Sequence, residues 1–229
     1  MYDELKEKVL EENLMLPRLG LVTFTWGNVS EIDRRNGVFA IKPSGVEYDT
    51  MKKDDIVIID LEGNKVDGKL RPSSDMLTHL ELYRAFEEIG GIVHTHSPYA
   101  TSWAQSEREL PCYGTTHADT FYGSVPLARL LTEEEIEDGY EKNTGKVIVE
   151  VFEGKDVMAV PAVLCSHHGP FSWGKDGFDA VHNAKVLEEC AKMALYTIIL
   201  DNKAKEAPDR IKDKHYFRKH GKDAYYGQN

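Results

Sequence analysis

The sequence has little positive charge and no long apolar run. Lys and Arg together number 28 against 39 Asp and Glu residues, which leaves a formal net charge of −11 over 229 residues. A protein that binds a duplex needs a basic face to displace counterions, so this balance argues against nucleic acid as the main partner. The best apolar run, residues 193–200, is far shorter than the roughly 20 residues that a membrane-spanning helix needs. We therefore expect a partner that is neither nucleic acid nor membrane.

Cysteine is also scarce, and repeats and low-complexity linkers are missing. Cys112, Cys165 and Cys190 form no CxxC pair, so they are expected to be reduced thiols. Residues 1–7 are charged and contain no apolar signal-peptide region, which favours a cytoplasmic protein. With 41% hydrophobic residues the chain can bury a core, and we expect one continuous domain over residues 1–229.

Apolar periodicity and turn residues predict mixed helices and strands. The first third is mostly antiparallel strand, with a hairpin of strands 29–33 and 38–42 around the pair Asn36-Gly37. The side chains of Ser73 and Ser74 are expected to cap a helix over residues 75–88. The other expected helices cover residues 2–16, 98–105, 132–141 and 176–200, and the other expected strands cover 21–25, 56–61, 91–96, 146–151 and 158–165.

The last segment differs from the rest of the chain. Residues 210–222 carry several Lys and Arg side chains and show no clear apolar stripe, which is typical of a solvated tail. The segment and its continuation also contain Tyr216, Phe217, Tyr225 and Tyr226, which are unfavourable in water. The competing prediction is a tail that docks on something, for example a neighbouring subunit.

A pair of histidines is the first sign of chemistry. In a strand, alternate side chains share a face, so His94 and His96 project to the same side and can chelate one metal ion. A third imidazole comes from the segment Ser166-His167-His168-Gly169, which ends another expected strand. Three neutral histidines suit a zinc-type ion and leave one coordination position open for substrate. The spacing does not choose between His167 and His168.

A second group of motifs contains residues that suit a phosphate. Glycine lets backbone N–H groups approach an anion, hydroxyls donate hydrogen bonds, and the helix expected after residue 74 aims its positive end at the same place. Taken singly, each motif also has an ordinary interpretation as a turn or a helix cap, and Asp75 as a first-turn acid. The group consists of Gly27-Asn28, Lys42-Pro43-Ser44-Gly45 and Pro72-Ser73-Ser74-Asp75.

A third cluster, residues 115–123, is polar and lacks helical periodicity. Its Asp119 could act as a general base or acid if it reaches a substrate proton. A loop aspartate that only satisfies nearby backbone groups is an equally good interpretation of this stretch.

Taken together, these motifs closely resemble the L-ribulose-5-phosphate 4-epimerases of the class II aldolase/epimerase superfamily. The resemblance extends from the first helix to the last residues. It rests on TWGNVS at 25–30, KPSGV at 42–46, PSSD at 72–75, GIVHTHS at 91–97, GTTHAD at 114–119, HGPF at 168–171, and the tail motifs KHY at 214–216, RKHG at 218–221 and AYYGQ at 224–228. Close relatives commonly have His-Ser-His-Gly where this chain has residues 166–169, which leaves only the role of His167 open.

The resemblance implies a three-layer α/β/α fold with a central, mostly antiparallel sheet, and a homotetramer whose active sites are shared by adjacent subunits. It implies Zn²⁺, or another divalent metal such as Mn²⁺ or Co²⁺, bound by His94, His96 and His168. Asp119 and Tyr226 of a neighbouring chain would form the acid–base pair, with tail residues 208–229 docked there and Asp75 beside the metal. The implied phosphate site consists of Gly27, Asn28, Lys42, Ser44, Gly45, Ser73 and Ser74, supported by His215.

The implied reaction interconverts L-ribulose 5-phosphate and D-xylulose 5-phosphate, as in arabinose catabolism or another pathway. C4 bears no acidic proton, so inversion requires a retro-aldol cut between C3 and C4, after which the aldehyde rotates and is attacked on its other face. A Lewis-acid metal is needed for the enediolate, the phosphate site must retain the aldehyde, and one proton-transfer group is needed on each face. Asp119 and Tyr226 fit the last role.

Three alternatives remain open. A class II aldolase of the L-fuculose-1-phosphate type would use the same metal and phosphate groups but release the aldehyde; in such relatives we expect Glu in place of Asp75 and a different tail. A zinc hydrolase can also use an HxH pair, but its usual pattern continues with an acid and another His, whereas Ser97-Pro98-Tyr99 follows here. A non-catalytic sugar-phosphate-binding protein would need no group of three histidines.

Overall fold

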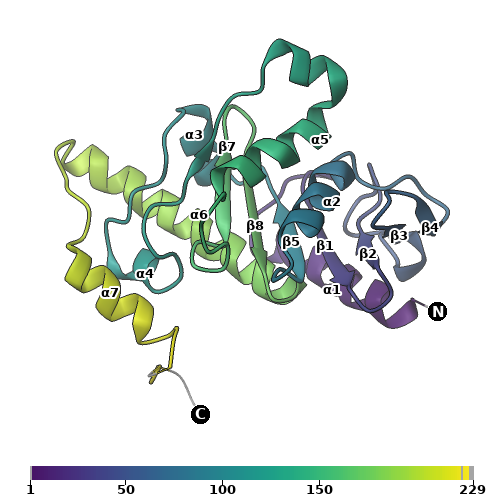
Figure 1. Ribbon diagram of the computed structural model, residues 1–229, viewed down its shortest axis with the longest axis horizontal. Coiled ribbons are helices and arrows are strands. Elements are labelled where there is room, and N and C mark those ends of the chain that lie inside the picture. The colour runs from purple at the N-terminus through teal and green to yellow at the C-terminus, as the bar shows by residue number, and fades with distance from the viewer. Residues whose placement is uncertain (1, 223, 227–229) are drawn as a thin grey trace.

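The computed structural model describes residues 2–222 and 224–226 (Figure 1). The helices are α1 (Asp3–Arg18), α2 (Met76–Ala85), α3 (Pro98–Gln105), α4 (Thr115–Ala118), α5 (Glu133–Val151), α6 (Gly177–Leu200) and α7 (Asp209–Phe217), with a short 3₁₀ helix at Lys53–Asp55. The strands are β1 (Asn28–Asp33), β2 (Val38–Ile41), β3 (Val57–Asp60), β4 (Lys65–Asp67), β5 (Gly91–His94), β6 (Leu127–Ala128), β7 (Ala162–Cys165) and β8 (Pro170–Gly174).

The strands form one eight-stranded sheet in the order β4-β3-β2-β1-β5-β8-β7-β6. Neighbouring strands are antiparallel except β6 and β7, which are parallel. The central pair β1 and β5 is in the register that places Asn28 opposite His94. This pairing brings a phosphate-motif residue and a metal-motif residue together at one end of the sheet.

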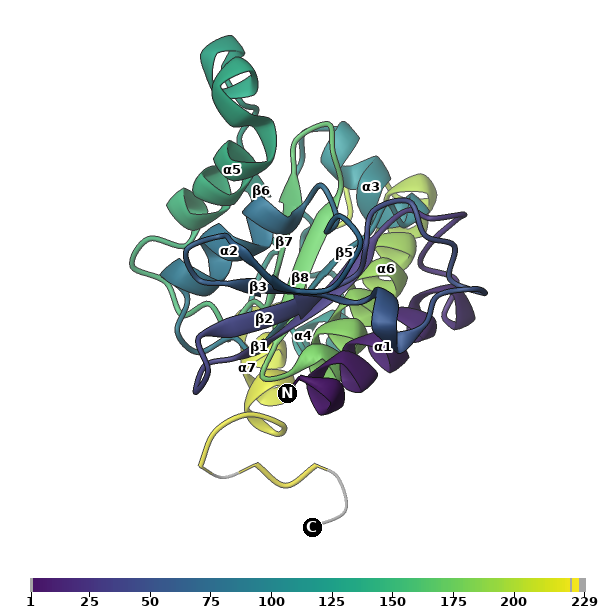
Figure 2. The same cartoon turned by 90° about the vertical axis from the view of Figure 1, so that its right-hand side faces the viewer.

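Apart from the exposed strand β4, the sheet packs against helices on both faces, and side chains alternate between these faces along each strand. On β2, Phe39 and Ile41 pack in the core beneath α2 and α5, whereas Val38 and Ala40 pack in the core beneath α1 and α6. Figure 2 shows the sheet between these two helix layers, with α3 on the same side as α6. The predicted single-domain α/β/α fold with a mostly antiparallel sheet is confirmed.

One predicted strand is wrong. Residues 146–151 belong to the second half of α5 rather than to a strand. Their β-branched side chains favour a strand by propensity, but tertiary packing decides otherwise. A Cβ atom added at Gly145 would lie 2.7 Å from Cβ of Glu81, so only glycine lets α5 approach α2 this closely. The helix buries Val147 and Ile148 against the core.

Other predicted elements differ in extent. Residues 21–25 are a loop rather than a strand, with Phe24 in the left-handed region at φ 53°. The predicted strand 91–96 ends at His94, and that at 158–165 narrows to β7. Helix α2 begins at Met76 after Asp75, and neither Ser73 nor Ser74 caps it. Strands β4, β6 and β8 and the single turn α4 were not predicted.

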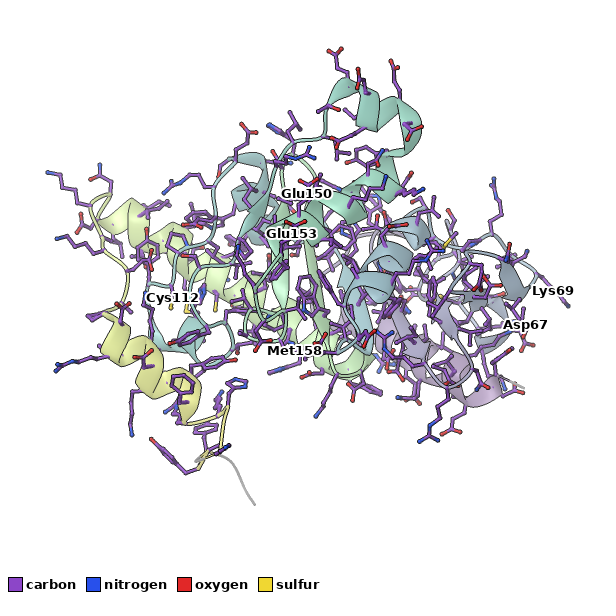
Figure 3. All side chains as sticks on the ribbon, in the orientation of Figure 1. Asp67, Lys69, Cys112, Glu150, Glu153 and Met158 are labelled. Carbon is purple, nitrogen blue, oxygen red and sulfur yellow. The ribbon has the colours of Figure 1, made fainter. Side chains whose placement is uncertain are left out.

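The tail residues 209–217 form helix α7, which packs against α4 at one end of the molecule (Figure 1). The prediction of a purely solvated tail is therefore wrong for this part, since it docks on its own chain. Cys112, labelled in Figure 3, is free and buried, as are Cys165 and Cys190. Among the described residues, no helix is long and apolar enough to cross a membrane.

Candidate active site

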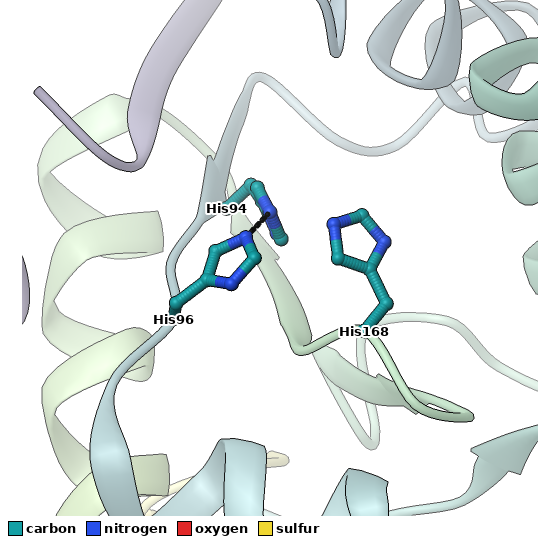
Figure 4. A group of neighbouring side chains, drawn as sticks. All are labelled: His94, His96 and His168. Carbon is teal, nitrogen blue, oxygen red and sulfur yellow. Dashed lines mark hydrogen bonds between the residues drawn. The ribbon is translucent and has the colours of Figure 1, made fainter.

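Three imidazoles meet where β5 ends and where the turn before β8 returns to it. His94 is the last residue of β5, His96 lies in the segment leading to α3, and His168 precedes β8. The Nε2 atoms of His94 and His96 are 3.0 Å apart, and one ring nitrogen from each of the three residues lies within 4.8 Å of the others. Figure 4 shows the ring of His168 facing the other two rings across a gap. The sequence prediction that these histidines converge is confirmed, although His96 lies beyond the strand.

The protonation of this group suits metal binding. His94 Nδ1 lies 3.0 Å from the carbonyl oxygen of Pro170, which can only accept, so Nδ1 donates there and Nε2 is left to face His96. Burial lowers the pKa of His168 to about 3, and burial together with His94 lowers the pKa of His96. His96 and His168 are therefore neutral at neutral pH, as metal ligands must be.

A test of the fit comes from His168. Its Nδ1 atom is buried and finds no hydrogen-bond partner among the residues that the structure describes. An unpaired buried nitrogen is unfavourable, and coordination to a cation through this ring would relieve the group of that penalty. Three imidazole nitrogens at these separations fit a tetrahedral zinc-type ion with one open position.

The structure also decides between the two adjacent histidines. His167 adopts a left-handed conformation at φ 55° in the turn, and its side chain is 53% exposed, with Nε2 3.6 Å from Glu107 Oε1. It therefore points away from the other imidazoles, while the turn directs His168 towards them. His168 is the third member of the group.

Lys42 provides the clearest sign of an anion site. The residue is only 1% exposed, and its Nζ donates to the carbonyl oxygens of Thr25 at 3.2 Å and Pro43 at 3.4 Å rather than to a carboxylate. Burial lowers the pKa of Lys42 to about 8, so its amine is still largely protonated at neutral pH. The ammonium also lies 4.8 Å from the centre of the Tyr48 ring, but neither the ring nor the carbonyls neutralise its charge, so an anion in the cavity would be stabilised beside it.

Polar groups around Lys42 and the histidines form one connected network. Asn28 Nδ2 donates to Ser73 Oγ at 3.0 Å and to Asp75 Oδ2 at 2.7 Å, while the buried Asn28 Oδ1 has no partner among the described residues. Gly27, at φ 77°, lets the loop pass so close to β5 that a Cβ there would lie 2.9 Å from the carbonyl oxygen of His94. The phosphate motifs and the metal motif thus share a single wall.

A cavity of about 580 Å³ unites these groups. It is lined by Gly27, Asn28, Lys42, Ser44, Gly45, Ser73, Ser74, Asp75, His94, His96 and His168, all singled out from the sequence. It is also lined by Thr25, Trp26, Pro43, Tyr140 and Glu141. The sequence did not indicate Tyr140 and Glu141 as site residues, because they follow a break inside α5 and no periodic pattern of apolar residues predicts where such a break will direct them.

The remaining predicted residues lie outside this lining and form a second cluster where α4 meets α7. Arg218 donates two hydrogen bonds to the carboxylate of Asp119, at 2.9 and 2.6 Å, and His215 Nδ1 lies 3.1 Å from the same group. The guanidinium also lies 4.7 Å from the ring centroid of the exposed Tyr226. A single chain therefore brings Asp119, Tyr226 and His215 to one another but not to the histidine group.

The electrostatics of this cluster keep Asp119 ionised. Burial by itself would raise the pKa of Asp119, but the hydrogen bonds from Arg218 and His215, with Lys219 nearby, outweigh it and hold the pKa below its ordinary value. At neutral pH this carboxylate can accept a proton but has none to give.

Comparison with known proteins agrees with this geometry. The family described as class II aldolase and adducin N-terminal domain matches residues 7–195. Because this range is most of the chain, the chain belongs to that family.

Solved structures of similar shape include an L-fuculose 1-phosphate aldolase, with 27% identity, a TM-score of 0.80, and coverage of 94% of this chain and 95% of the other. The L-fuculose-1-phosphate aldolase of Thermus thermophilus is 22% identical, with a TM-score of 0.68 and coverage of 89% and 98%. A sugar-phosphate aldolase from Thermotoga maritima is 20% identical, with a TM-score of 0.66 and coverage of 90% and 98%. The last two support the fold alone.

Proposed function

We propose that this protein is a divalent-metal-dependent enzyme that interconverts L-ribulose 5-phosphate and D-xylulose 5-phosphate by retro-aldol cleavage and re-addition. One observation carries the proposal: a group of three histidines and the buried Lys42, which pairs with no carboxylate of the described residues, line the same cavity. A ligand whose phosphate lies beside Lys42 can then present its carbon chain to the imidazoles. Membership of the class II aldolase family supports the same chemistry.

His94, His96 and His168 would hold the ion, and imidazole ligands favour Zn²⁺, with Mn²⁺ or Co²⁺ as alternatives. When bound, the ion supplies Lewis-acid stabilisation for the negative charge that develops on the ketose oxygens. The lining hydroxyls of Ser44 and Ser73 and the amine of Lys42 would grip the phosphate. Such a grip retains the aldehyde fragment while it rotates, which the inversion at C4 requires.

Two proton-transfer groups complete the proposal. The ionised Asp119 would take the proton of the C4 hydroxyl in one epimer, and the phenol of Tyr226 would serve the opposite face. Since both lie outside the cavity of their own chain, we propose that they act in the site of a neighbouring subunit of a homotetramer, docked through residues 208–229. His215 would then support the phosphate end of that shared site.

A second candidate is an aldolase of the L-fuculose-1-phosphate type, which would release the aldehyde. The 27% identical structure described by that name favours it. The presence of Asp75 where we expect Glu in such aldolases, together with the tail motifs, leads us to prefer the epimerase.

The test is to incubate zinc-loaded protein with L-ribulose 5-phosphate and to measure D-xylulose 5-phosphate and free aldehyde in the same samples. Epimerisation without free aldehyde is the expected result. Accumulation of glycolaldehyde phosphate, or cleavage of L-fuculose 1-phosphate at a higher kcat/KM, would establish the aldolase instead. Binding without turnover of either sugar would overturn both. A His168→Gln variant is the control for contaminating activity.

A further inference from the structure

Tyr140 lines the cavity beside the histidines, and the reaction proposed above gives it no role. Its ring centroid is 5.7 Å from that of His168, with the planes inclined by 48°. The residue is 38% exposed. Its hydroxyl makes no hydrogen bond to any other residue within the described part of the chain. An aromatic residue with a free O–H donor, partly open to the cavity, is able to contact a ligand there.

The backbone holds Tyr140 in place. Helix α5 is interrupted at Gly139, whose φ of 149° and ψ of 86° are outside the helical region and are accessible essentially only to glycine. The acidic first half of α5 projects away from the body of the molecule, whereas the second half packs along α2 (Figure 2). Tyr140 is the first residue of that second half.

Two contacts fix this second half against the wall of the site. Thr78 Oγ1 donates to the carbonyl oxygen of Glu141 at 2.6 Å, and Gly145 allows the close approach to Glu81 described above. Thr78 belongs to α2, the helix that begins directly after Asp75. These contacts fix Tyr140 relative to α2 and to the carboxylate of Asp75. Side chains that are held in this way discriminate well between ligands.

The ends of the cavity are chemically different. The phosphate-binding groups cluster around Lys42, whereas the ring of Tyr140 contacts that of His168, at the metal end. The phenol hydroxyl of Tyr140 is a hydrogen-bond donor. A sugar phosphate anchored at Lys42 therefore has its unphosphorylated end near a neutral donor and an aromatic wall.

We propose that Tyr140 is a specificity-determining residue, whose ring limits the chain length of the substrate at its unphosphorylated end and whose hydroxyl donates a hydrogen bond to an oxygen at that end. The inference rests on the proposed function, because it takes the ligand to be a sugar phosphate with its phosphate beside Lys42. The role of Tyr140 adds selection of the substrate by the length of its carbon chain, which neither the histidines nor the phosphate-binding groups can provide.

The test measures binding rather than turnover. Calorimetry on metal-free protein gives Kd for three probes: L-ribulose 5-phosphate, glycolaldehyde phosphate, which lacks the unphosphorylated end, and a hex-3-ulose 6-phosphate, which is one carbon longer there. Tyr140→Phe removes only the hydroxyl, and Tyr140→Ala also removes the ring. Tyr2→Phe, which deletes a phenolic oxygen beside α1 and away from the cavity, is the matched control.

Tyr140→Phe is expected to weaken binding of L-ribulose 5-phosphate about 5- to 20-fold and to leave glycolaldehyde phosphate within about twofold. Tyr140→Ala is expected to reduce the preference for the five-carbon over the six-carbon ketose phosphate by at least about fivefold. Unchanged affinity in Tyr140→Phe together with an unchanged length preference in Tyr140→Ala would overturn the inference.

The binding and activity results separate the two proposals. If wild-type protein binds L-ribulose 5-phosphate in the Tyr140-dependent manner but does not convert it when zinc-loaded, the reaction is wrong and the inference stands. If it converts the sugar while both Tyr140 variants bind as wild type does, the inference fails and the reaction stands. No measurable binding of L-ribulose 5-phosphate by wild-type protein, together with no turnover by the zinc-loaded protein, would overturn both.

Discussion

The charge state of Lys42 offers a direct test of the phosphate site. Burial lowers the pKa of this amine to about 8, and a phosphate dianion bound beside it would raise the pKa again, because an adjacent opposite charge favours the ammonium. Binding must then be accompanied by proton uptake wherever the free amine is partly neutral. The uptake should grow as pH rises through the pKa of the free protein.

The size of the uptake follows from that pKa. With a free value of about 8 and a bound value well above 9, the protein takes up ~0.1 proton per phosphate at pH 7, ~0.5 at pH 8 and ~0.9 at pH 9. The phosphate monoester, whose second pKa is about 6, releases ~0.1 proton at pH 7 when it binds as the dianion, which offsets the uptake there but not at pH 8 or pH 9. Replacing the charged donor should cost about 1.5–3 kcal/mol, or roughly 10- to 150-fold in Kd.

Calorimetry in two buffers with different ionisation enthalpies measures the uptake, with L-ribulose 5-phosphate as ligand and metal-free protein to prevent turnover. Lys42→Met, which retains the apolar part of the side chain, should abolish the uptake and weaken binding by that factor. Lys65→Met, on the exposed strand β4, is the control. An uptake that does not change between pH 7 and pH 9, or a Lys42→Met variant that binds as wild type does, would show that phosphate does not lie beside this amine.

Three further predictions concern the proton-transfer cluster, the metal and the buried acid of α1. Asp119→Asn should retain bound zinc, measured by elemental analysis, but lose at least about 100-fold in kcat, since the ionised base is gone; a kcat within a few-fold of wild type would remove Asp119 from the mechanism. Chelation should abolish turnover, which zinc should restore in wild type but not in His168→Gln; restoration in the variant would exclude His168 as a ligand. Burial and the adjacent Glu31 raise the pKa of Glu12 from 4.5 to about 10, so the folded state binds a proton that the unfolded chain releases, and stability must fall between those pH values. Glu12→Gln should therefore be more stable than wild type at pH 9 by roughly 1–3 kcal/mol in urea unfolding, with little gain at pH 5; parallel pH profiles would contradict this.

Local rules account for what the sequence predicted well. The hairpin at Asn36-Gly37 and helix α3, found over the predicted residues 98–105, depend on turn and start signals within a few residues. The phosphate motifs depend likewise on glycine and hydroxyl side chains in short loops. Their grouping in one cavity follows from the pairing of β1 with β5, which the sequence motifs imply only through the family resemblance.

Contacts between distant segments explain what could not be predicted. Residues 146–151 are helical because Gly145 lets this part of α5 pack closely against α2, which lies some 60 residues away in sequence. Helix α7 has no fully buried residue. Hydrogen bonds from His215 and from Arg218, just after the helix, to Asp119 hold it in place, together with the rings of Tyr216 and Phe217 against Tyr122, all about 100 residues apart in sequence. Tyr140 reaches the cavity through the break at Gly139, and no pattern of hydrophobicity indicates where a broken helix will point.

The two clusters of one chain explain why the proposed enzyme should be an oligomer. If Asp119 and Tyr226 of one subunit complete the histidine site of the next, the contact joins two different surfaces and is heterologous. Repetition of such a contact by rotation closes into a ring, in which every subunit both gives and receives a half-site. In such a ring the contacts of Arg218 with Asp119 and Tyr226 would present the carboxylate and the tyrosine together to the neighbouring cavity. Each site would draw its histidines and its proton-transfer groups from different chains. It follows that a mixture of Asp119→Asn and His168→Gln subunits, each inactive alone, has about one quarter of its sites intact after random reassembly.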